Sequence, residues 1–170
     1  ITKKAIINGL LVMSTDLSTC ELEVTENGKI TIPANRILTV KGQVINSATA
    51  TDFVVANDAM LIQVGDIENQ GSITVLRNSN PMKRLDYTLW SSPVEGMLLK
   101  NFSQVSNSGG TGTIWNRVYT LGELAWDQVW NSYTEVESGS HTFGIGKGYL
   151  YRARNDYHNT NTVVLQGEFT

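Results

Sequence analysis

The stretch ELEVTENGKITIPANRILTVKGQVIN, residues 21–46, decides how the first half of this chain folds. Its apolar residues fall two positions apart in short runs, separated by glycine and asparagine: Leu22 and Val24, Ile30 and Ile32, Leu38 and Val40. An apolar residue at every second position is typical of a strand with one buried face, and Gly and Asn are typical of turns. The stretch therefore predicts a succession of short β-strands.

Parts of this pattern recur along the first eighty residues. Gly28-Lys-Ile-Thr-Ile32 resembles Gly71-Ser-Ile-Thr-Val75, and Gly65 follows Gly42 after 23 residues. Ala56-Asn57 repeats Ala34-Asn35 after 22 residues. A period of this length is typical of solenoids, in which each turn buries its apolar face on its neighbours. We expect a short β-solenoid (β-helix-like) of three turns, at about residues 5–26, 28–50 and 53–76. The alternative is an antiparallel sandwich whose turns recur.

The composition changes near residue 80. Phe53 is the one aromatic residue before Tyr87, and thirteen aromatic residues follow from Tyr87 onward, among them all four tryptophans. Strand-like runs broken by prolines and glycines predict a β-sandwich or jelly roll in this half. We therefore expect an all-β chain with a solenoid over residues 1–78 and an aromatic-rich, sandwich-like segment over residues 79–170 that caps the solenoid.

The overall composition is typical of a folded protein. Of its 170 residues 41% are hydrophobic and 17% are charged, which argues against disorder. A net charge of -3 argues against nucleic acid and against an electrostatic membrane contact, because both need a basic face. No apolar run approaches the roughly 18 residues of a membrane-spanning helix. The chain begins at Ile1 and ends at Thr170 in strand-like sequence, so we expect a piece of a longer protein.

Catalytic and metal-binding patterns are not found in the sequence. Gly144-Ile-Gly-Lys-Gly148 lacks the spacing of a phosphate loop, and no Gly-x-Ser-x-Gly nucleophile motif is present. His141 and His158 have no carboxylates at the spacing of a metal site, and Cys20 is the single cysteine. We expect a protein that is not an enzyme and has no cofactor.

Oxygen-bearing side chains gather near the expected corners of the solenoid: Asp52, Asn57, Asp58, Asp66 and Asn69. Carboxylate and amide oxygens are ligands for Ca²⁺, so a calcium site is one interpretation. No known calcium-loop spacing occurs, and ordinary turns in which Asp and Asn bond the backbone are the interpretation that we favour.

The aromatic residues of the second half have two interpretations. They either form a core or present a sugar-stacking surface, for which the candidate residues are Trp126, Trp130, Tyr149 and Tyr151, with Asp86 as a polar neighbour. Tyr149 and Tyr151 share one face of a predicted strand. Large aromatic residues are more often core, which makes the core interpretation the favoured one.

The run Asp86-Tyr-Thr-Leu-Trp-Ser-Ser-Pro-Val94 resembles a "DYxxWSSPV" motif of large secreted and surface proteins of Bacteroidota that use the type IX secretion route. Two further phrases resemble the same family: Asn69-Gln-Gly-Ser-Ile-Thr-Val-Leu-Arg77 upstream, and Gly146-Lys-Gly-Tyr149 with Arg152-Ala153 downstream. A cysteine at the start of the strand region, here Cys20, also recurs. Arg152-Ala-Arg-Asn155 departs from the commoner "RAP" continuation.

This resemblance implies an extracellular, adhesin-like structural module. Its partners would be other modules of the same long chain and a surface ligand such as a glycan, with no nucleic acid and no membrane insertion. Exposed strand edges would permit self-assembly, including filaments. The alternative function is a carbohydrate-binding module of a secreted polysaccharide-processing protein. The resemblance supplies no catalytic residues.

Overall fold

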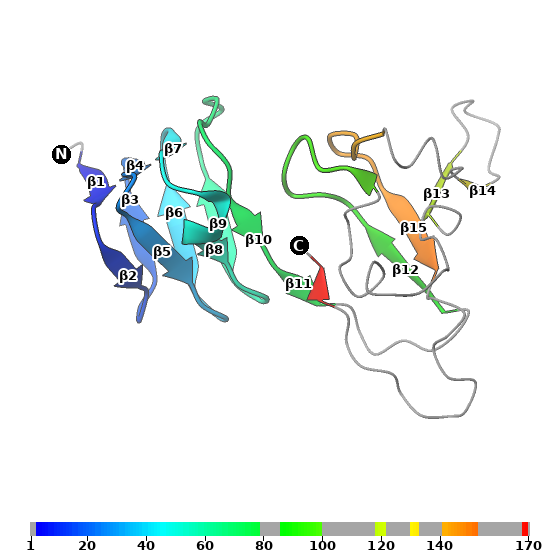
Figure 1. Ribbon diagram of the computed structural model, residues 1–170, viewed down its shortest axis with the longest axis horizontal. Coiled ribbons are helices and arrows are strands. Elements are labelled where there is room, and N and C mark those ends of the chain that lie inside the picture. The colour runs from blue at the N-terminus through cyan, green and yellow to red at the C-terminus, as the bar shows by residue number, and fades with distance from the viewer. Residues whose placement is uncertain are drawn as a thin grey trace. The chain divides into compact units, whose positions relative to one another are not determined.

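The computed structural model describes residues 3–78, 86–99, 118–121, 130–132, 141–152 and 168–169, and it divides into two units, Ile1–Arg77 and Asn78–Thr170 (Figure 1). Among the described residues nearly all regular structure is strand, with one short 3-10 turn, η1 (Ala50–Asp52). The expectation of an all-β chain is therefore confirmed.

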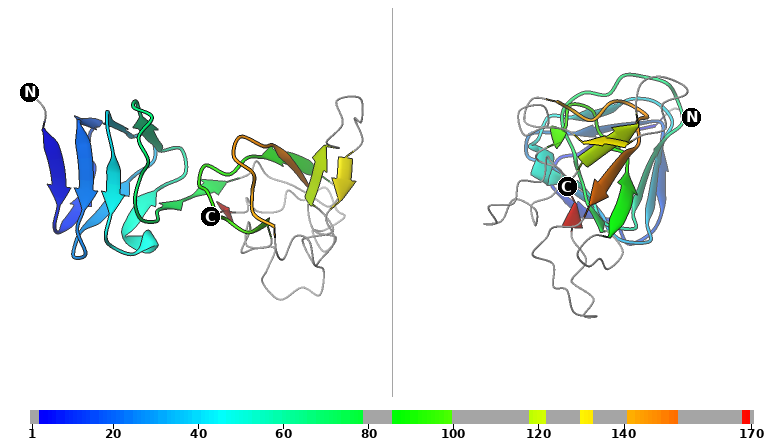
Figure 2. Two further views of the ribbon diagram at one scale, coloured as in Figure 1. Left: turned by 90° about the horizontal axis from the view of Figure 1, so that it is seen from above. Right: turned by 90° about the vertical axis from the view of Figure 1, so that its right-hand side faces the viewer.

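The first unit winds its strands into three turns, and each turn adds one strand to each of three parallel sheets. A further strand after the third turn extends the second sheet. Figure 1 and Figure 2 show the strands of successive turns side by side. The first sheet contains β1 (Lys4–Ile7), β4 (Glu21–Val24) and β7 (Val44–Asn46). The second contains β2 (Leu10–Val12), β5 (Lys29–Ile32), β8 (Phe53–Val55) and β10 (Thr74–Val75). The third contains β3 (Leu17–Thr19), β6 (Ile37–Val40) and β9 (Met60–Gln63). The predicted β-solenoid is thus confirmed.

The core of the solenoid consists of apolar rows that run from turn to turn. Because side chains alternate between the two faces of a strand, every second residue points inward, and the parallel register places like positions side by side. Ile30 lies beside Phe53, and Val55 follows two positions later. Phe53, Ile30 and Val55 are at most 1% exposed. Each such side chain contributes about 1.5–3 kcal/mol on burial, which makes these rows the main source of stability.

The turns lengthen along the chain. Lys4 pairs with Glu21, 17 positions on, whereas Leu38 pairs with Leu61, 23 positions on. The corner between the first and second sheets grows through residues 8–9, 25–28 and 47–52, while the corner between the second and third sheets keeps four residues in every turn. In chain order from β1, the turns span residues 4–19, 21–40 and 44–63. The expected turn 28–50 holds one strand of each sheet, and the register places its start beside that of the expected turn 53–76. The expected turn 5–26 was wrong, because the first turn is shorter than the repeat of 22 or 23 residues and this range also takes in β4.

The four-residue corner has the same backbone conformation in the second and third turns. Asn35 and Asp58 have φ angles of 60° and 59°, and the Asn35 N–H donates to the Asp58 carbonyl at 2.9 Å. Asn and Asp tolerate this left-handed conformation better than other residues with a side chain. The sequence repeat aligned Asn35 with Asn57, but the structure aligns Asn35 with Asp58.

The described part of the second unit is an antiparallel sheet with the strand order β12-β15-β13-β14. Its strands are β12 (Tyr87–Trp90), β15 (Tyr149–Arg152), β13 (Val118–Leu121) and β14 (Trp130–Ser132). Two short strands, β11 (Arg77–Asn78) and β16 (Glu168–Phe169), form a separate pair. A sandwich needs a second facing sheet, so the sandwich-like architecture of this half stays a prediction.

Candidate functional site

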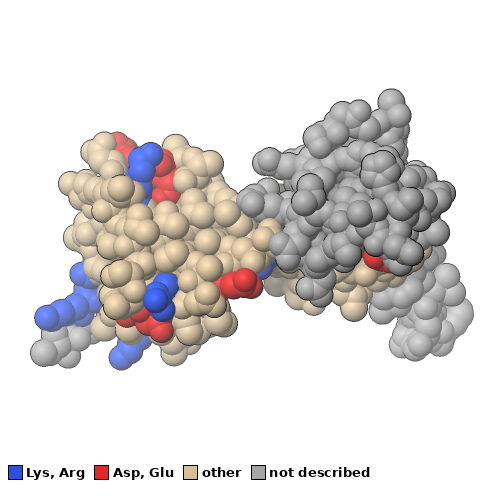
Figure 3. All heavy atoms as spheres, turned by 90° about the horizontal axis from the view of Figure 1, so that it is seen from below, with Lys and Arg blue, Asp and Glu red and all other residues tan. Residues whose placement is uncertain are grey.

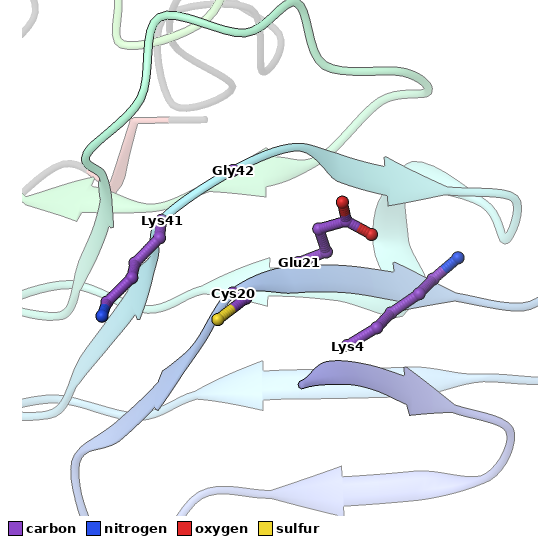
Figure 4. Close-up of a pocket in the computed structure, with 5 residues that line it drawn as sticks. All are labelled: Lys4, Cys20, Glu21, Lys41 and Gly42. Atoms are coloured by element: carbon purple, nitrogen blue, oxygen red, sulfur yellow. The ribbon is translucent and has the colours of Figure 1, made fainter. Parts of the chain in front are cut away.

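An open hollow lies at the corner between the third and first sheets of the solenoid (Figure 4). It has a volume of about 600 Å³ and is lined by Lys4, Cys20, Glu21, Lys41 and Gly42. Lys4 and Glu21 stand side by side on β1 and β4, and the Gly42 N–H donates to the Cys20 carbonyl at 2.7 Å. The hollow is therefore formed where adjacent turns of the solenoid pass the same corner.

The charges around this hollow are engaged in structural contacts. Lys4 Nζ lies 2.6 Å from Glu23 Oε2 on the neighbouring strand. The hydrogen bond to Glu23 is the main cause that raises the pKa of Lys4 above its ordinary value, and the charges of Glu23 and Glu21 raise it further. Figure 4 shows the side chains of Lys4 and Lys41 pointing away from each other. A protonated lysine held by an acid is a poor nucleophile, so this geometry favours a structural role.

The surface of the solenoid carries scattered rather than gathered charge on the side drawn in Figure 3. Basic and acidic side chains lie in small separate groups, some mixed and some of one sign, and a broad uncharged surface lies between them. One mixed pair is Lys29 Nζ with Asp52 Oδ1, at 2.7 Å. Because these groups are small and separate, they form no continuous basic surface on that side.

The acidic and amide residues of the corners bond to neighbours in the protein. Asp52 accepts from Lys29 and, through Oδ2, from Thr49 Oγ1 at 2.7 Å. Lys29 first and Thr49 second lower the pKa of Asp52 below its ordinary value. Asn57 Nδ2 donates to Asp58 Oδ2 at 2.8 Å. Within the described part of the chain no group of three or more His, Cys, Asp or Glu side chains could hold a metal ion.

Residues 69–77, which we call the closing segment, bond back onto the third turn of the solenoid. Asn69 Oδ1 accepts from the Val44 N–H at 2.9 Å, and Asn69 Nδ2 donates to Gln63 Oε1 at 2.7 Å. Further along, Ile73 and Val75 pack against the core. The segment thus supplies both polar and apolar contacts to the last turn.

Asn46 is the buried polar residue at the centre of these contacts, with 5% of its surface exposed. Its Nδ2 donates to the Ser72 carbonyl at 2.6 Å, and its Oδ1 accepts from the Ala48 N–H at 3.2 Å. Gly71 passes so close that a Cβ atom there would lie 1.9 Å from the Asn46 carbonyl oxygen, and its φ is +85°. Only glycine fits this approach without displacing the backbone.

Arg77 completes the closing segment. Its guanidinium donates to three backbone carbonyls: Nη1 to Ala56 at 3.0 Å and to Leu76 at 2.7 Å, and Nη2 to Ala59 at 3.0 Å. The planar fork of donors suits several acceptors at once. Arg77 therefore holds the corner between the second and third sheets of the third turn.

Tyr149, one of the candidate glycan-binding residues, agrees with the favoured core interpretation. Tyr149 is 2% exposed, its hydroxyl accepts from the Gly144 N–H at 2.9 Å, and its ring meets Phe143 edge-on with centroids 4.8 Å apart. The register pairs Tyr149 with the half-buried Trp90. Tyr149 is therefore a core residue in this structure, and its ring is not part of an exposed stacking surface.

The other candidate residues of that surface are described only in part. Asp86 is half-buried just before β12. Trp130 and Tyr151 are described through their backbone in β14 and β15, and Trp126 lies outside the described residues. On the opposite face of β12, Tyr87 is 52% exposed and Leu89 is also exposed.

Sequence reasoning missed the roles of Asn46 and Arg77. Asn46 ends a strand and looks like an ordinary turn residue. Two of the three carbonyls that Arg77 binds, those of Ala56 and Ala59, are about one turn of chain away from it. The available signal was the recurrent phrase at residues 69–77, whose Asn, Gly and Arg all take part in closing the solenoid.

These features define an all-β protein built on a short parallel β-solenoid whose last turn is closed by a polar segment. None of the described residues forms a helix with the length and apolarity needed to cross a membrane. The chain belongs to the family DUF8693, a domain of unknown function, whose model matches residues 1–170. Comparison with curated proteins and with solved structures found no match.

Proposed function

We propose that this chain is a non-enzymatic structural and adhesive module of a large secreted or cell-surface bacterial protein. The observation that carries the proposal is that these polar side chains of the solenoid bond to other groups of the solenoid itself. Asn46, Asn69 and Arg77 bond the backbone or neighbouring side chains of the last turn, and Asp52 pairs with Lys29. Such contacts support a stiff scaffold with a continuous hydrogen-bonded backbone.

The proposed extracellular location is supported by the resemblance of residues 86–94 and 69–77 to proteins of the type IX secretion route. In the proposed role, the solenoid extends or spaces the parent protein, and neighbouring modules of the same chain or a surface ligand are its partners. Continuous parallel ladders suit this role because separating the turns requires many backbone hydrogen bonds to break together.

Protease treatment of intact cells of the source bacterium tests this proposal. We expect peptides of this chain to be released from the cell surface or found in the medium, while a cytoplasmic marker protein stays protected. Recovery of the chain only from lysed cells would contradict the proposed location.

A carbohydrate-binding module is the second candidate, and the exposure of Tyr87 favours it, since an exposed aromatic ring can stack on the apolar face of a sugar. The test is a glycan array with the whole chain and with the variants Tyr87→Ala, Trp126→Ala and Trp130→Ala. Lost glycan binding with an unchanged unfolding temperature would support this function. Unfolding of the tryptophan variants would identify those residues as core.

A further inference from the structure

The corner between the first and second sheets contains the same dipeptide in two successive turns. Asn8-Gly9 lies there in the first turn and Asn27-Gly28 in the second, and the sequence has no other Asn-Gly pair. An asparagine before glycine is prone to attack by its own backbone, because the glycine nitrogen reaches the side-chain carbonyl carbon with no Cβ atom in the way. Since the two dipeptides are chemically identical, any difference in their reactivity comes from the fold.

The fold holds Asn27-Gly28 in an unreactive arrangement. The Gly28 N–H donates to the Thr25 carbonyl at 2.8 Å and closes a turn around Asn27. Gly28 is buried, and a Cβ atom there would overlap the Ile7 carbonyl oxygen of the first turn. To attack the Asn27 side chain, the Gly28 nitrogen has to leave its hydrogen bond and rotate within a packed corner. Both requirements oppose the reaction at Asn27.

The backbone nitrogen of Gly9 is not held in this way. Asn8 and Gly9 are exposed, and the Gly9 N–H donates to no residue that the structure describes. The pairing of β2 with β5 begins at the other end of this residue, where the Gly9 carbonyl accepts from the Lys29 N–H at 2.9 Å. The nitrogen that would attack is thus available, while its residue is anchored to the second turn.

Thr25 of the second turn holds the side-chain amide that would be attacked. Its N–H donates to the Ile7 carbonyl at 3.0 Å, and its Oγ1 lies 2.6 Å from Asn8 Oδ1 and 3.2 Å from that same carbonyl. A hydroxyl has one proton to donate, and the shorter distance assigns it to Asn8 Oδ1. A donor on this oxygen polarises Asn8 Cγ and stabilises the negative charge that develops on Oδ1 during attack.

We propose that Asn8-Gly9 is a self-modification site, at which Asn8 is converted through a cyclic imide to aspartate and isoaspartate with help from the Thr25 hydroxyl, while the fold protects Asn27-Gly28. The Gly9 nitrogen gives its proton to hydroxide and bonds to Asn8 Cγ. The Cγ–Nδ2 bond then breaks, and Nδ2 takes a proton from water and leaves as ammonia.

Water opens the cyclic imide at either of its two carbonyls. Breaking the bond from Gly9 nitrogen to Asn8 Cγ gives aspartate, and breaking the bond to the main-chain carbonyl of residue 8 gives isoaspartate. The whole sequence consumes water and releases ammonia, with no change in oxidation state. Because it needs no enzyme, the acid form accumulates with time and marks long-lived copies of the protein.

Mass spectrometry of the whole chain, aged at mildly alkaline pH, tests the proposal. Digestion after glutamate separates the two sites, since Glu21, Glu23 and Glu26 lie between them. We expect conversion of amide to acid to be at least about tenfold faster at Asn8 than at Asn27 in the folded chain, because Asn27 reacts only after its turn opens. In guanidinium chloride the two rates should become similar. An isoaspartate methyltransferase assay identifies the rearranged product.

Substitutions at Thr25 test the role of its hydroxyl. Thr25→Val keeps the shape of the side chain and should slow the conversion of Asn8 by about 2- to 10-fold, the range that one hydrogen bond provides. The control Thr25→Ser keeps the hydroxyl and should react at about the wild-type rate. A slow rate at Asn27 in both variants shows that the corner is still folded.

Four outcomes would overturn the proposal. They are an Asn8 that keeps its amide in the folded chain, equal rates at the two sites in the folded chain, a ratio of rates that persists after unfolding, and a folded Thr25→Val variant that reacts as fast as the wild type.

Discussion

At the scale of single residues, Gly71 is the position that tolerates a side chain least. We expect Gly71→Ala to lower the free energy of unfolding by at least about 1–2 kcal/mol, the cost of a left-handed backbone in a residue with a Cβ, with a further loss from the contact with the Asn46 carbonyl. Urea denaturation measures this loss. Gly9→Ala is the control, because no heavy atom lies within 4 Å of its Cβ position. Equal losses in the two variants would contradict this account.

Asn46 provides a second prediction at this scale. Asn46→Ala removes the donor to the Ser72 carbonyl and the acceptor for the Ala48 N–H. Leaving buried backbone groups without partners costs about 1–3 kcal/mol, so the midpoint of urea denaturation should fall accordingly. Asn57→Ala, at a corner where Asn57 Nδ2 donates to Asp58 Oδ2 at the surface, should cost much less. A larger loss of stability in Asn57→Ala than in Asn46→Ala would contradict a stabilising role for the buried side-chain amide of Asn46.

At the scale of elements, the closing segment depends on Arg77. Replacing Arg77 with Met keeps most of the side-chain volume but removes the donors to the carbonyls of Ala56, Ala59 and Leu76. Hydrogen bonds to charged groups contribute about 1.5–3 kcal/mol each, so we expect a clear drop in unfolding temperature together with faster hydrogen exchange in β10. Arg36→Met, which removes one exposed bond to the Asn35 carbonyl, should leave both measurements nearly unchanged.

The pair formed by Lys29 on β5 and Asp52 of η1 predicts a pH dependence. Folding lowers the pKa of Asp52 below its ordinary value of 3.8, so the stabilisation is present above that value and is lost as the pH falls through the lower, folded pKa. Thermal unfolding should therefore show a smaller loss of stability on acidification in Asp52→Asn than in the wild-type chain. An identical acid dependence in the two proteins would mean that the pair does not contribute.

The strands of the solenoid were predictable because their alternation is a local property of the sequence. Gly28–Ile32 and Gly71–Val75 do fall in one sheet, with Thr31 and Thr74 in register on either side of Val54. Turn lengths were not predictable, because the residues of a corner are free to lengthen without changing the strands that they join. The alternation also separated the two faces of β12 and β15, and the buried Tyr149 agrees with the favoured core interpretation of its face.

At the scale of the whole molecule, the two units are expected to respond separately to a change in the solenoid core. Phe53 is completely buried, and Phe53→Ala should cost about 3–5 kcal/mol. Hydrogen exchange should accelerate in β5 and β8, while the amides of β12 and β15 keep their wild-type rates. Acceleration in both units would instead mean that they unfold as one cooperative body.

The candidate site at this scale was less predictable than the fold. A sequence shows which residues are aromatic or acidic, but the partners of Arg77 and Asn46 become neighbours only after two turns have stacked. The exposure of side chains in the first turn follows the same rule, since Ile6, Leu10 and Val12 fit an ordinary strand pattern and their exposure depends on what lies beside them.

The unequal lengths of the turns have a consequence for how such a protein can change in evolution. Each winding of the backbone has more residues than the one before it at two corners and the same number at the third. The windings are therefore not interchangeable. A duplicate of the widest winding inserted ahead of the narrowest would leave the neighbouring corners out of line. Growth by copying is therefore easiest where the spacing between paired residues is constant, as it is from Ile30 to Phe53 and from Ile37 to Met60, 23 positions in each case.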